Sequence, residues 1–174
     1  MRTLFINGTV GVGKTTTAAA VSRILSAQGR PHAVIDTDSL RDRYPTPVHD
    51  PFDLELELRN LAAVSANYRQ AGCELLIVAG VIEDPNAVER YCAATGVPSD
   101  GTGEFFFVRL IATPQTINAR ICARHMGDEV ERDWYLERAP RLASILEQRG
   151  LGRAFDADKR KEAVAQAIME VTRL

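Results

Sequence analysis

Residues 8–15 read GTVGVGKT, which fits the glycine-rich pattern G-x-x-x-x-G-K-[ST] of phosphate-binding loops. The preceding residues 3–7 form a short apolar run typical of a buried parallel strand. Residues 15–28 are rich in alanine with apolar residues at helical spacing, and Gly29 ends this expected helix. Strand, loop and helix follow in the order that turns backbone N–H groups toward an anion.

Lys14 is the only lysine before Lys159, although arginine is frequent throughout the chain. A loop that cradles phosphate needs a compact ammonium on a slim stem, whereas guanidinium is a rigid planar fork. We therefore predict binding of a nucleoside triphosphate, with Lys14 at the outer phosphates and the Thr15 hydroxyl on Mg²⁺. The loop leaves the choice between ATP and GTP open. The alternative is a glycine-rich turn that merely joins a strand to a helix. The residues expected to bind ATP are Gly8, Thr9, Val10, Gly11, Val12, Gly13, Lys14, Thr15 and Thr16.

The composition favours a single globular domain that spans residues 1–174, with 45% hydrophobic and 25% charged residues. A net charge of −2 and an isoelectric point near 5.9 argue against general binding to nucleic acid. No stretch approaches the roughly 18 apolar residues that a membrane span needs. Met1 lies next to the first expected strand, and the three cysteines show no paired spacing. We therefore expect no signal peptide, no disulfide framework and a cytoplasmic location.

Strand and helix signals alternate along the rest of the chain, which favours an α/β fold whose parallel sheet is covered on both faces. Further strands are expected at 32–35, 74–79, 104–112 and 153–156. Helices are expected at 52–71, 84–94, 113–125 and 133–148 and near the C-terminus, with a surface turn at 98–103.

Two carboxylates, Asp36 and Asp38, follow the second expected strand. In open α/β sheets, ligands bind beyond the carboxyl ends of the strands, so this pair is a candidate for chemistry. One carboxylate can hold Mg²⁺ while the other accepts a proton from an attacking hydroxyl group. We assign the metal to Thr15 and Asp36 and the base to Asp38, although the sequence leaves the reverse assignment open. The alternative for Asp38 is that it caps a helical turn.

The third expected strand ends in Ala79-Gly80, where a hydrolytic ATPase or a GTPase usually has a magnesium-binding aspartate. Because this aspartate is absent, we expect Asp36 and Asp38 to supply the carboxylates of the site. Glu83 and Asp84 are possible substitutes, but capping of the helix that begins at Pro85 explains them as well. No N-K-x-D segment for reading guanine is present, which argues against a GTPase.

Arg120 and Arg124 lie four residues apart on one face of an expected helix. Two arginines there can stabilise the charge of a transferring phosphoryl group, and the alternatives are a solvated helix face or a favourable interaction with the helix dipole. Weaker candidates are Arg132, Arg138 and Arg141, and Trp134 is interpreted as core or helix packing.

Together, the loop at 8–15, the D-x-D pair, the glycine after the third strand and the R-x-x-x-R helix resemble the small P-loop kinases. This group includes shikimate kinase, gluconate kinase, adenylylsulfate kinase and chloramphenicol phosphotransferase. The L-D-G-D-N-[IV]-R segment of adenylylsulfate kinase is similar to residues 35–41, and its E-N-I-R-R segment resembles residues 59–63. The positions that match these motifs, and are therefore expected to bind the acceptor, are Asp36, Asp38, Arg41, Asn60 and Gly80.

The resemblance implies a three-layer P-loop NTPase fold with sheet order 2-3-1-4-5 and a small mobile lid near residues 124–132. The chain departs from adenylylsulfate kinase after the third strand and after the arginine helix, so the acceptor is not carried over. We expect a phosphotransferase, monomeric or homodimeric, that moves the γ-phosphoryl group of ATP to a hydroxyl of a metabolite, nucleotide or antibiotic. The alternative is a nucleotide-binding regulator or weak ATPase without such an acceptor.

Overall fold

A five-stranded parallel sheet forms the centre of the computed structural model, which describes residues 1–98 and 103–174. The strands run in the order β2-β3-β1-β4-β5, which confirms the expected α/β class and topology. Most of the surface turn expected at 98–103 lies outside the described residues. The strands are β1 (Arg2–Gly8), β2 (His32–Asp36), β3 (Leu75–Ala79), β4 (Phe105–Ile111) and β5 (Arg153–Asp156).

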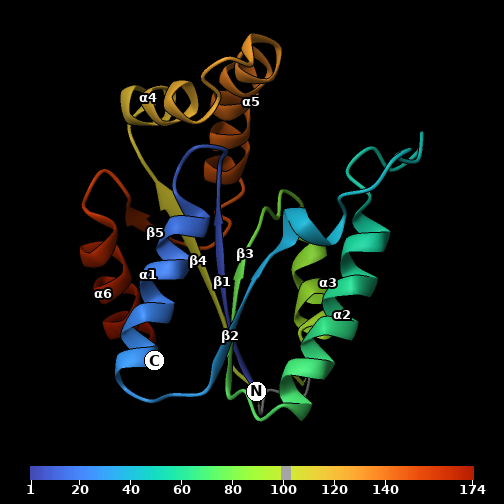
Figure 1. Cartoon of the computed structure of the whole chain (residues 1–174), viewed down its shortest axis with the longest axis vertical. Coiled ribbons are helices and arrows are strands. Elements are labelled where there is room, and N and C mark those ends of the chain that lie inside the picture. The colour runs from blue at the N-terminus through green and yellow to red at the C-terminus, as the bar shows by residue number, and fades with distance from the viewer. Residues whose placement is uncertain (99–102) are drawn as a thin grey trace.

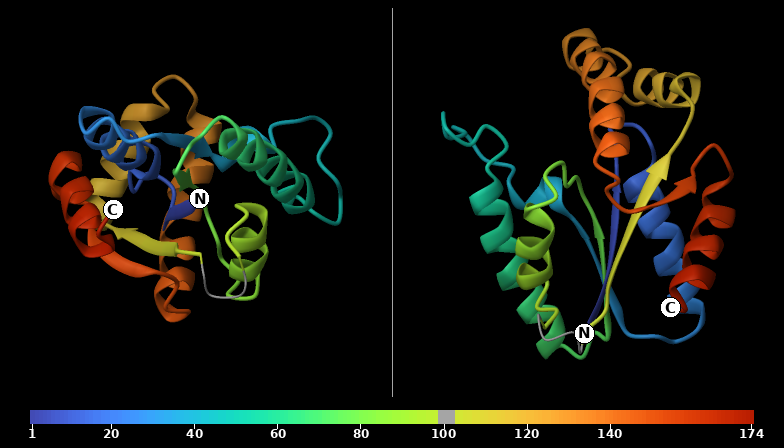
Figure 2. Two further views of the ribbon diagram at one scale, coloured as in Figure 1. Left: turned by 90° about the horizontal axis from the view of Figure 1, so that it is seen from below. Right: turned by 180° about the vertical axis from the view of Figure 1, so that it is seen from behind.

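Helices cover both faces of this sheet and make a three-layer arrangement (Figures 1 and 2). One face is covered by α1 (Lys14–Ala27) and α6 (Lys161–Thr172), and the other by α2 (Leu54–Gln70) and α3 (Ala87–Ala94). Beyond the carboxyl ends of the strands lie α4 (Pro114–Arg124) and α5 (Glu129–Gln148), in the upper part of Figure 1. None of the helices in the described part of the chain is long and apolar enough to cross a membrane.

The two central strands explain the continuous apolar runs of the sequence. Leu4, Phe5 and Ile6 of β1 are fully buried, and every residue of β3 is buried. Strands that are covered on both faces have no polar side, so their sequences do not alternate.

The buried Asn7, near the end of β1, fixes the segment that follows β3. Its side-chain amide donates to the Ile82 carbonyl at 3.1 Å, and its oxygen accepts from the backbone N–H of Ile82 at 3.1 Å. Because a buried amide is costly unless it is hydrogen-bonded, this pair of bonds holds the segment in one place. Residues 81–84 therefore lie beside the P-loop (residues 8–15).

The helix expected from residue 133 begins earlier, at Glu129. The Asp128 carboxylate accepts a hydrogen bond of 2.9 Å from the backbone N–H of Glu131, which is an N-cap interaction. The polar segment that precedes Asp133 is therefore the first turn of α5 and brings additional side chains toward α4.

Candidate active site

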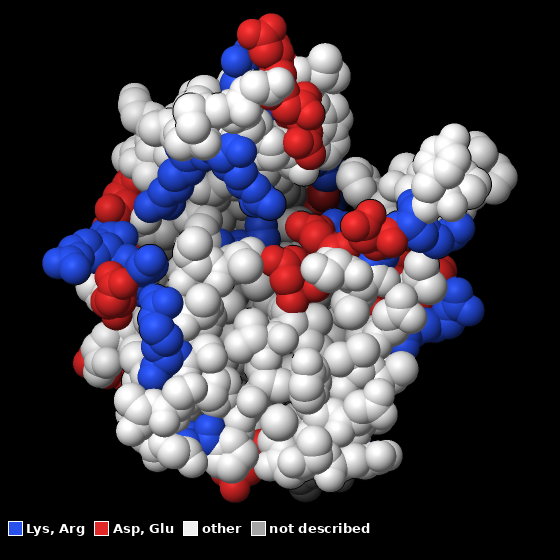
Figure 3. Space-filling model, viewed as in Figure 1, with Lys and Arg blue, Asp and Glu red and all other residues white. Residues whose placement is uncertain are grey.

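A cleft of about 1380 Å³ opens between the carboxyl ends of the strands and the pair α4 and α5. Its volume exceeds the roughly 300–1,000 Å³ of a pocket for one small ligand, so it has room for two. The charges along it are separated (Figure 3). Basic side chains gather on the side of α4 and of the β5–α6 segment, and acidic side chains gather around the short 3₁₀ helix η1 (Thr37–Leu40).

The P-loop lines one wall of this cleft, and most of its expected ligand-binding residues face the open space. The residues that line the cleft are Val10, Gly11, Gly13, Lys14, Thr15 and Thr16, whereas Gly8, Thr9 and Val12 are buried behind them. The buried Thr9 hydroxyl donates to the Ala139 carbonyl of α5 at 2.6 Å, which ties the loop to that helix.

Glycine is required in this loop for conformation and for space. Gly13 has φ of 107° at the N-cap of α1, and no side chain caps the first N–H groups of that helix. A Cβ atom at Gly11 would lie 2.8 Å from Ile121 Cγ1 of α4. The open N-terminus of α1 therefore faces the cleft with unpaired donors and the positive end of the helix dipole, which suits a phosphate.

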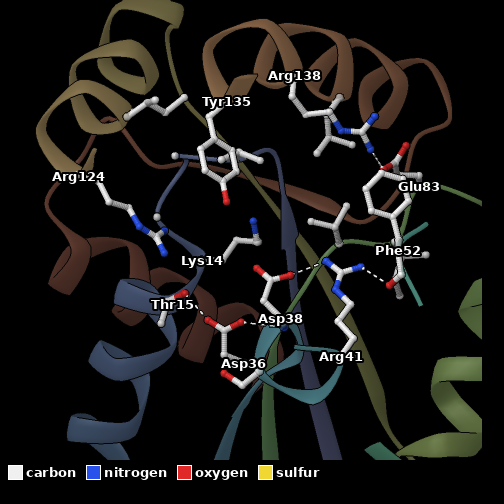
Figure 4. A pocket seen from close by; sticks show the side chains of 18 of the residues that line it. Lys14, Thr15, Asp36, Asp38, Arg41, Phe52, Glu83, Arg124, Tyr135 and Arg138 are labelled. Atoms are coloured by element: carbon white, nitrogen blue, oxygen red, sulfur yellow. Dashed lines mark hydrogen bonds and ion pairs between the residues drawn. The ribbon is translucent and has the colours of Figure 1, made fainter. Parts of the chain in front are cut away.

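Lys14 extends into the middle of the cleft (Figure 4). In the described part of the chain, its ammonium makes one hydrogen bond, of 3.2 Å, to the carbonyl of Thr9. Burial lowers the pKa of Lys14 to about 8, although the nearby carboxylates of Asp38 and Asp36 oppose this shift. A desolvated ammonium with one neutral partner is unfavourable by itself, so the position fits a polyphosphate that supplies the missing negative charge.

Thr15 and Asp36 place two hard oxygen donors side by side. The Thr15 hydroxyl donates to the Asp36 carboxylate at 2.7 Å, and Asp36 also accepts from the backbone N–H of Asp38 at 3.2 Å. Among the described residues, no group of three or more His, Cys, Asp or Glu side chains is arranged to hold a metal ion. A pair of oxygen donors fits Mg²⁺, which keeps several waters and phosphate oxygens as ligands when it binds with a nucleotide.

Asp38 is exposed in the cleft and held by an arginine. Arg41 Nη2 lies 2.5 Å from an oxygen of Asp38, and Arg41 Nε lies 3.3 Å from the buried carboxylate of Glu57. Tyr91 donates its hydroxyl to the other oxygen of Glu57 at 2.5 Å. Burial raises the pKa of Glu57, while the Tyr91 hydrogen bond and the Arg41 charge oppose this shift. Charges from two sides therefore orient Arg41, and Arg41 orients Asp38.

Three residues expected to bind the acceptor have other contacts. The remaining Arg41 nitrogen, Nη1, donates to the Phe52 carbonyl at 3.1 Å, so this arginine is occupied within the chain. Asn60 donates to the Leu40 carbonyl at 2.6 Å, and a Cβ at Gly80 would lie 2.7 Å from Thr37 Oγ1. Asn60 and Gly80 do not line the cleft and instead support η1. Both motif positions are matched, but Asn60 acts through its hydrogen bond to η1 and Gly80 through the space that it leaves for Thr37.

The two arginines of α4 have different surroundings. Arg120 donates to the carbonyls of Val12 and Ala157 at 2.8 and 2.9 Å, so it ties the P-loop to the segment after β5. Arg124, one turn further on, points into the cleft toward Thr15 (Figure 4). Within the described residues, Arg124 has no hydrogen-bond or ion-pair partner. Of the two arginines, Arg124 is therefore the one whose side chain is free to meet an anion in the cleft.

On α5, the sequence indicated Arg138 only as a weaker candidate and did not indicate Tyr135. Tyr135 directs its hydroxyl into the cleft opposite Lys14, and burial raises the pKa of this phenol, so it stays protonated and is a hydrogen-bond donor. Arg138 forms an ion pair with Glu83, and its guanidinium lies 5.1 Å from the centre of the Phe52 ring. Trp134, interpreted as core or helix packing, packs against Tyr135 of the same helix but is half exposed at the cleft, so the core alternative is wrong. The spacing of Tyr135, Arg138 and Leu142 is a one-face pattern that could have indicated this wall.

Comparison with solved structures shows the fold of small P-loop kinases. The tunicamycin resistance protein of Deinococcus radiodurans has 23% identity and a TM-score of 0.64, with 99% of this chain and 96% of that chain covered. A gluconokinase of Sinorhizobium meliloti has 16% identity and a TM-score of 0.61, with 99% and 91% covered. A shikimate kinase of Bacteroides thetaiotaomicron has 22% identity and a TM-score of 0.58, with 99% of both chains covered.

A comparison with curated protein sequences gives no match. Among protein families, the CobQ/CobB/MinD/ParA nucleotide binding domain matches residues 3–98, which is more than half of the chain. The matched segment contains the P-loop, Asp36, Asp38 and the segment after β3 up to α3. The chain therefore belongs to the CobQ/CobB/MinD/ParA nucleotide binding domain family.

Proposed function

We propose that the protein is an ATP- and Mg²⁺-dependent kinase that transfers the γ-phosphoryl group to a hydroxyl of a small molecule. The observation that carries this proposal is one cleft that holds both a P-loop and an oriented carboxylate. Lys14 and the open N-terminus of α1 lie on one side, and Asp38 lies next to Lys14 on the other (Figure 4). A protein that only binds a nucleotide has no need of an arginine-held carboxylate beside the phosphates.

The binding half of the mechanism rests on the P-loop. Backbone N–H groups and Lys14 would hold the outer phosphates, and Thr15 and Asp36 would hold the metal ion. When bound, Mg²⁺ neutralises part of the charge on the phosphate oxygens. Arg120 keeps the loop in position through its bonds to Val12 and Ala157.

The transfer half rests on Asp38, Arg124 and Tyr135. Asp38 accepts the proton of the attacking hydroxyl, which raises the nucleophilicity of the acceptor oxygen. Arg41 holds this carboxylate in one orientation through their 2.5 Å contact. Arg124 and the Tyr135 hydroxyl face the phosphates and stabilise negative charge on the transferring group. Because α4 and α5 form one wall of the cleft, they would limit the access of water to this group, which favours transfer over hydrolysis.

Replacement of Asp38 tests the assignment of the base. Asp38→Asn retains the size and the exposure of the side chain but cannot accept the proton, so kcat should fall by about 10²–10⁴-fold. The affinity for MgATP should change little, because Asp38 is not a phosphate ligand. The measurements are ADP release in the presence of an acceptor and calorimetry with MgATP.

Asp133→Asn is the matched control for this experiment, since Asp133 is an exposed carboxylate paired with Arg132 on α5. Full turnover by Asp38→Asn would overturn the base assignment. ATP hydrolysis that no hydroxyl compound alters would instead favour the nucleotide-binding regulator or weak ATPase.

A further inference from the structure

The cleft has an acceptor side, which we define by Asp38, Arg41, Phe52, Val81, Glu83 and Arg138. Every arginine on this side is already matched by a carboxylate of the chain. Arg41 contacts Asp38 and Glu57, and Arg138 is paired with Glu83. These ion pairs leave the acceptor side without a free cation among the described residues.

The neighbouring Arg43 is also occupied. Its Nε lies 2.5 Å from the carboxylate of Asp53, whose side chain is 5% exposed, and its Nη1 donates to the Pro45 carbonyl at 2.8 Å. A surface arginine that is free to swing inward would add a positive charge to the cleft. The buried partner prevents this, because breaking the pair would leave the Asp53 charge desolvated and alone.

Carboxylates are in excess on this side of the cleft. Asp42, Asp50 and Asp84 line it, and none of them has an ion-pair partner in the part of the chain that the structure describes. Backbone N–H groups of the chain lower the pKa of Asp50, so its negative charge persists at neutral pH. Lys14 and Arg124 line the same cleft without an ion-pair partner among the described residues, and the triphosphate of the proposed reaction would occupy both. An acceptor with its own negative charge would therefore meet only repulsion.

The same region exposes apolar surface. Phe52 is 45% exposed and Trp134 is 50% exposed, and both line the cleft together with Val81 and Leu142. The guanidinium groups of Arg41 and Arg138 lie 5.9 and 5.1 Å from the centre of the Phe52 ring and restrict its position. Aromatic side chains fixed in this way offer a rigid apolar contact at low entropic cost.

We propose that the acceptor is a hydroxyl compound that carries no carboxylate, sulfate or phosphate and has an apolar or aromatic group beside its hydroxyl. This inference rests on the proposed function, because it names the second substrate of the same cleft. The hydroxyl would lie at Asp38, and the apolar group would lie against Phe52 and Trp134. Negative charge would be excluded by the carboxylates that surround this position.

Matched pairs of acceptors test the exclusion of negative charge. The pairs are uridine with uridine 5′-monophosphate, methyl shikimate with shikimate, and an aryl diol of the phenicol type with its hemisuccinate ester. ADP release with saturating MgATP gives kcat/KM for each compound. For any pair that is turned over, kcat/KM of the uncharged member should be higher by about tenfold or more. Equal or higher kcat/KM for the anionic member would overturn the inference.

A variant that removes the ion-pair partner of Arg138 tests whether the paired arginine causes the preference for uncharged acceptors. Glu83→Gln leaves Arg138 without its partner, so the preference for the uncharged member should fall by about tenfold. Glu137→Gln is the matched control, because it releases Arg141, whose ion pair lies at the exposed surface of the same helix. An unchanged preference in a folded Glu83→Gln variant would contradict the role of the paired arginine. If the wild-type protein binds and hydrolyses MgATP at a rate that no member of any pair alters, the result contradicts the proposed function itself.

Discussion

The protonation of Lys14 is subject to two opposing effects. Burial in the free protein favours the neutral amine, whereas a bound polyphosphate would favour the charged ammonium. Burial lowers the pKa of Lys14 to about 8 in the free protein, against a reference value of 10.5. Below pH 8 the side chain is an ammonium that attracts phosphate. Between pH 8 and 10.5 the folded protein releases this proton before the unfolded chain does. Binding and stability should therefore respond in opposite directions to the same titration.

The pH dependence of MgATP affinity measures this residue directly. Between pH 7 and 9.5 the dissociation constant should rise above pH 8, by up to about tenfold per unit, because binding then requires uptake of a proton. Over the same range this lysine should contribute increasing stability, since less charge remains buried. Calorimetry and urea unfolding measure the two effects. In Lys14→Met both dependences should disappear, and a flat wild-type affinity over this range would contradict the assigned environment.

Single residues were predictable from the sequence where a local pattern fixes their geometry. Lys14, Thr15 and the pair Asp36 and Asp38 could be placed because each stands at a fixed distance from a strand end. Asn60 and Gly80 matched family motifs, but motifs do not tell which way a side chain points. The pairing of Arg138 with Glu83 joins residues 55 positions apart, so it depends on how α5 lies over the sheet.

At the scale of the elements, two arginines of α4 that lie one turn apart make different contacts. Arg120 bonds to two backbone carbonyls, while Arg124 faces the open cleft. The i, i+4 spacing predicted a shared face correctly, but not this division. The two arginines differ because the P-loop and the segment after β5 both come within hydrogen-bond distance of Arg120.

Substitution of each arginine should separate the two roles. Arg120→Ala removes two charge-assisted hydrogen bonds that hold the P-loop, so the dissociation constant for MgATP should rise by about tenfold or more. Arg124→Ala should lower kcat by about 10²-fold or more, with a smaller change in MgATP affinity. The checks are calorimetry and steady-state kinetics. Arg23→Ala, on the exposed surface of α1, serves as the control.

If both substitutions weakened binding equally and left kcat unchanged, the two side chains would have a common role in holding the nucleotide. The division of roles along α4 would then be wrong. A loss of kcat in Arg120→Ala without a change in MgATP affinity would also contradict it.

The helix α5 shows why elements at the edge of a site are harder to predict than those in the core. Strands β1 and β3 are fully enclosed, so their sequences must be apolar and are easily recognised. The helix α5 is partly exposed and carries polar side chains on its cleft side and its solvent side alike. The one-face spacing of Tyr135, Arg138 and Leu142 is therefore only a weak signal in the sequence, and the fold is needed to show that this face lines the cleft.

Across the whole molecule, the sheet topology sets up the separation of charge in Figure 3. The P-loop follows the central strand β1, and the acidic η1 follows the edge strand β2, with β3 between them. The basic α4 follows β4 on the opposite side of β1. The strand order alone therefore puts the P-loop between an acidic and a basic wall. The fold was predictable to this extent from the P-loop and the alternation of elements.

The most direct test of the whole account is the transfer of label from [γ-³²P]ATP to an uncharged aryl diol, with Mg²⁺ and the wild-type protein. The account predicts a labelled organic phosphate formed in equal amount to ADP, and no labelled product with Lys14→Met or without Mg²⁺. Release of the label only as inorganic phosphate, at a rate that no hydroxyl compound changes, would contradict it.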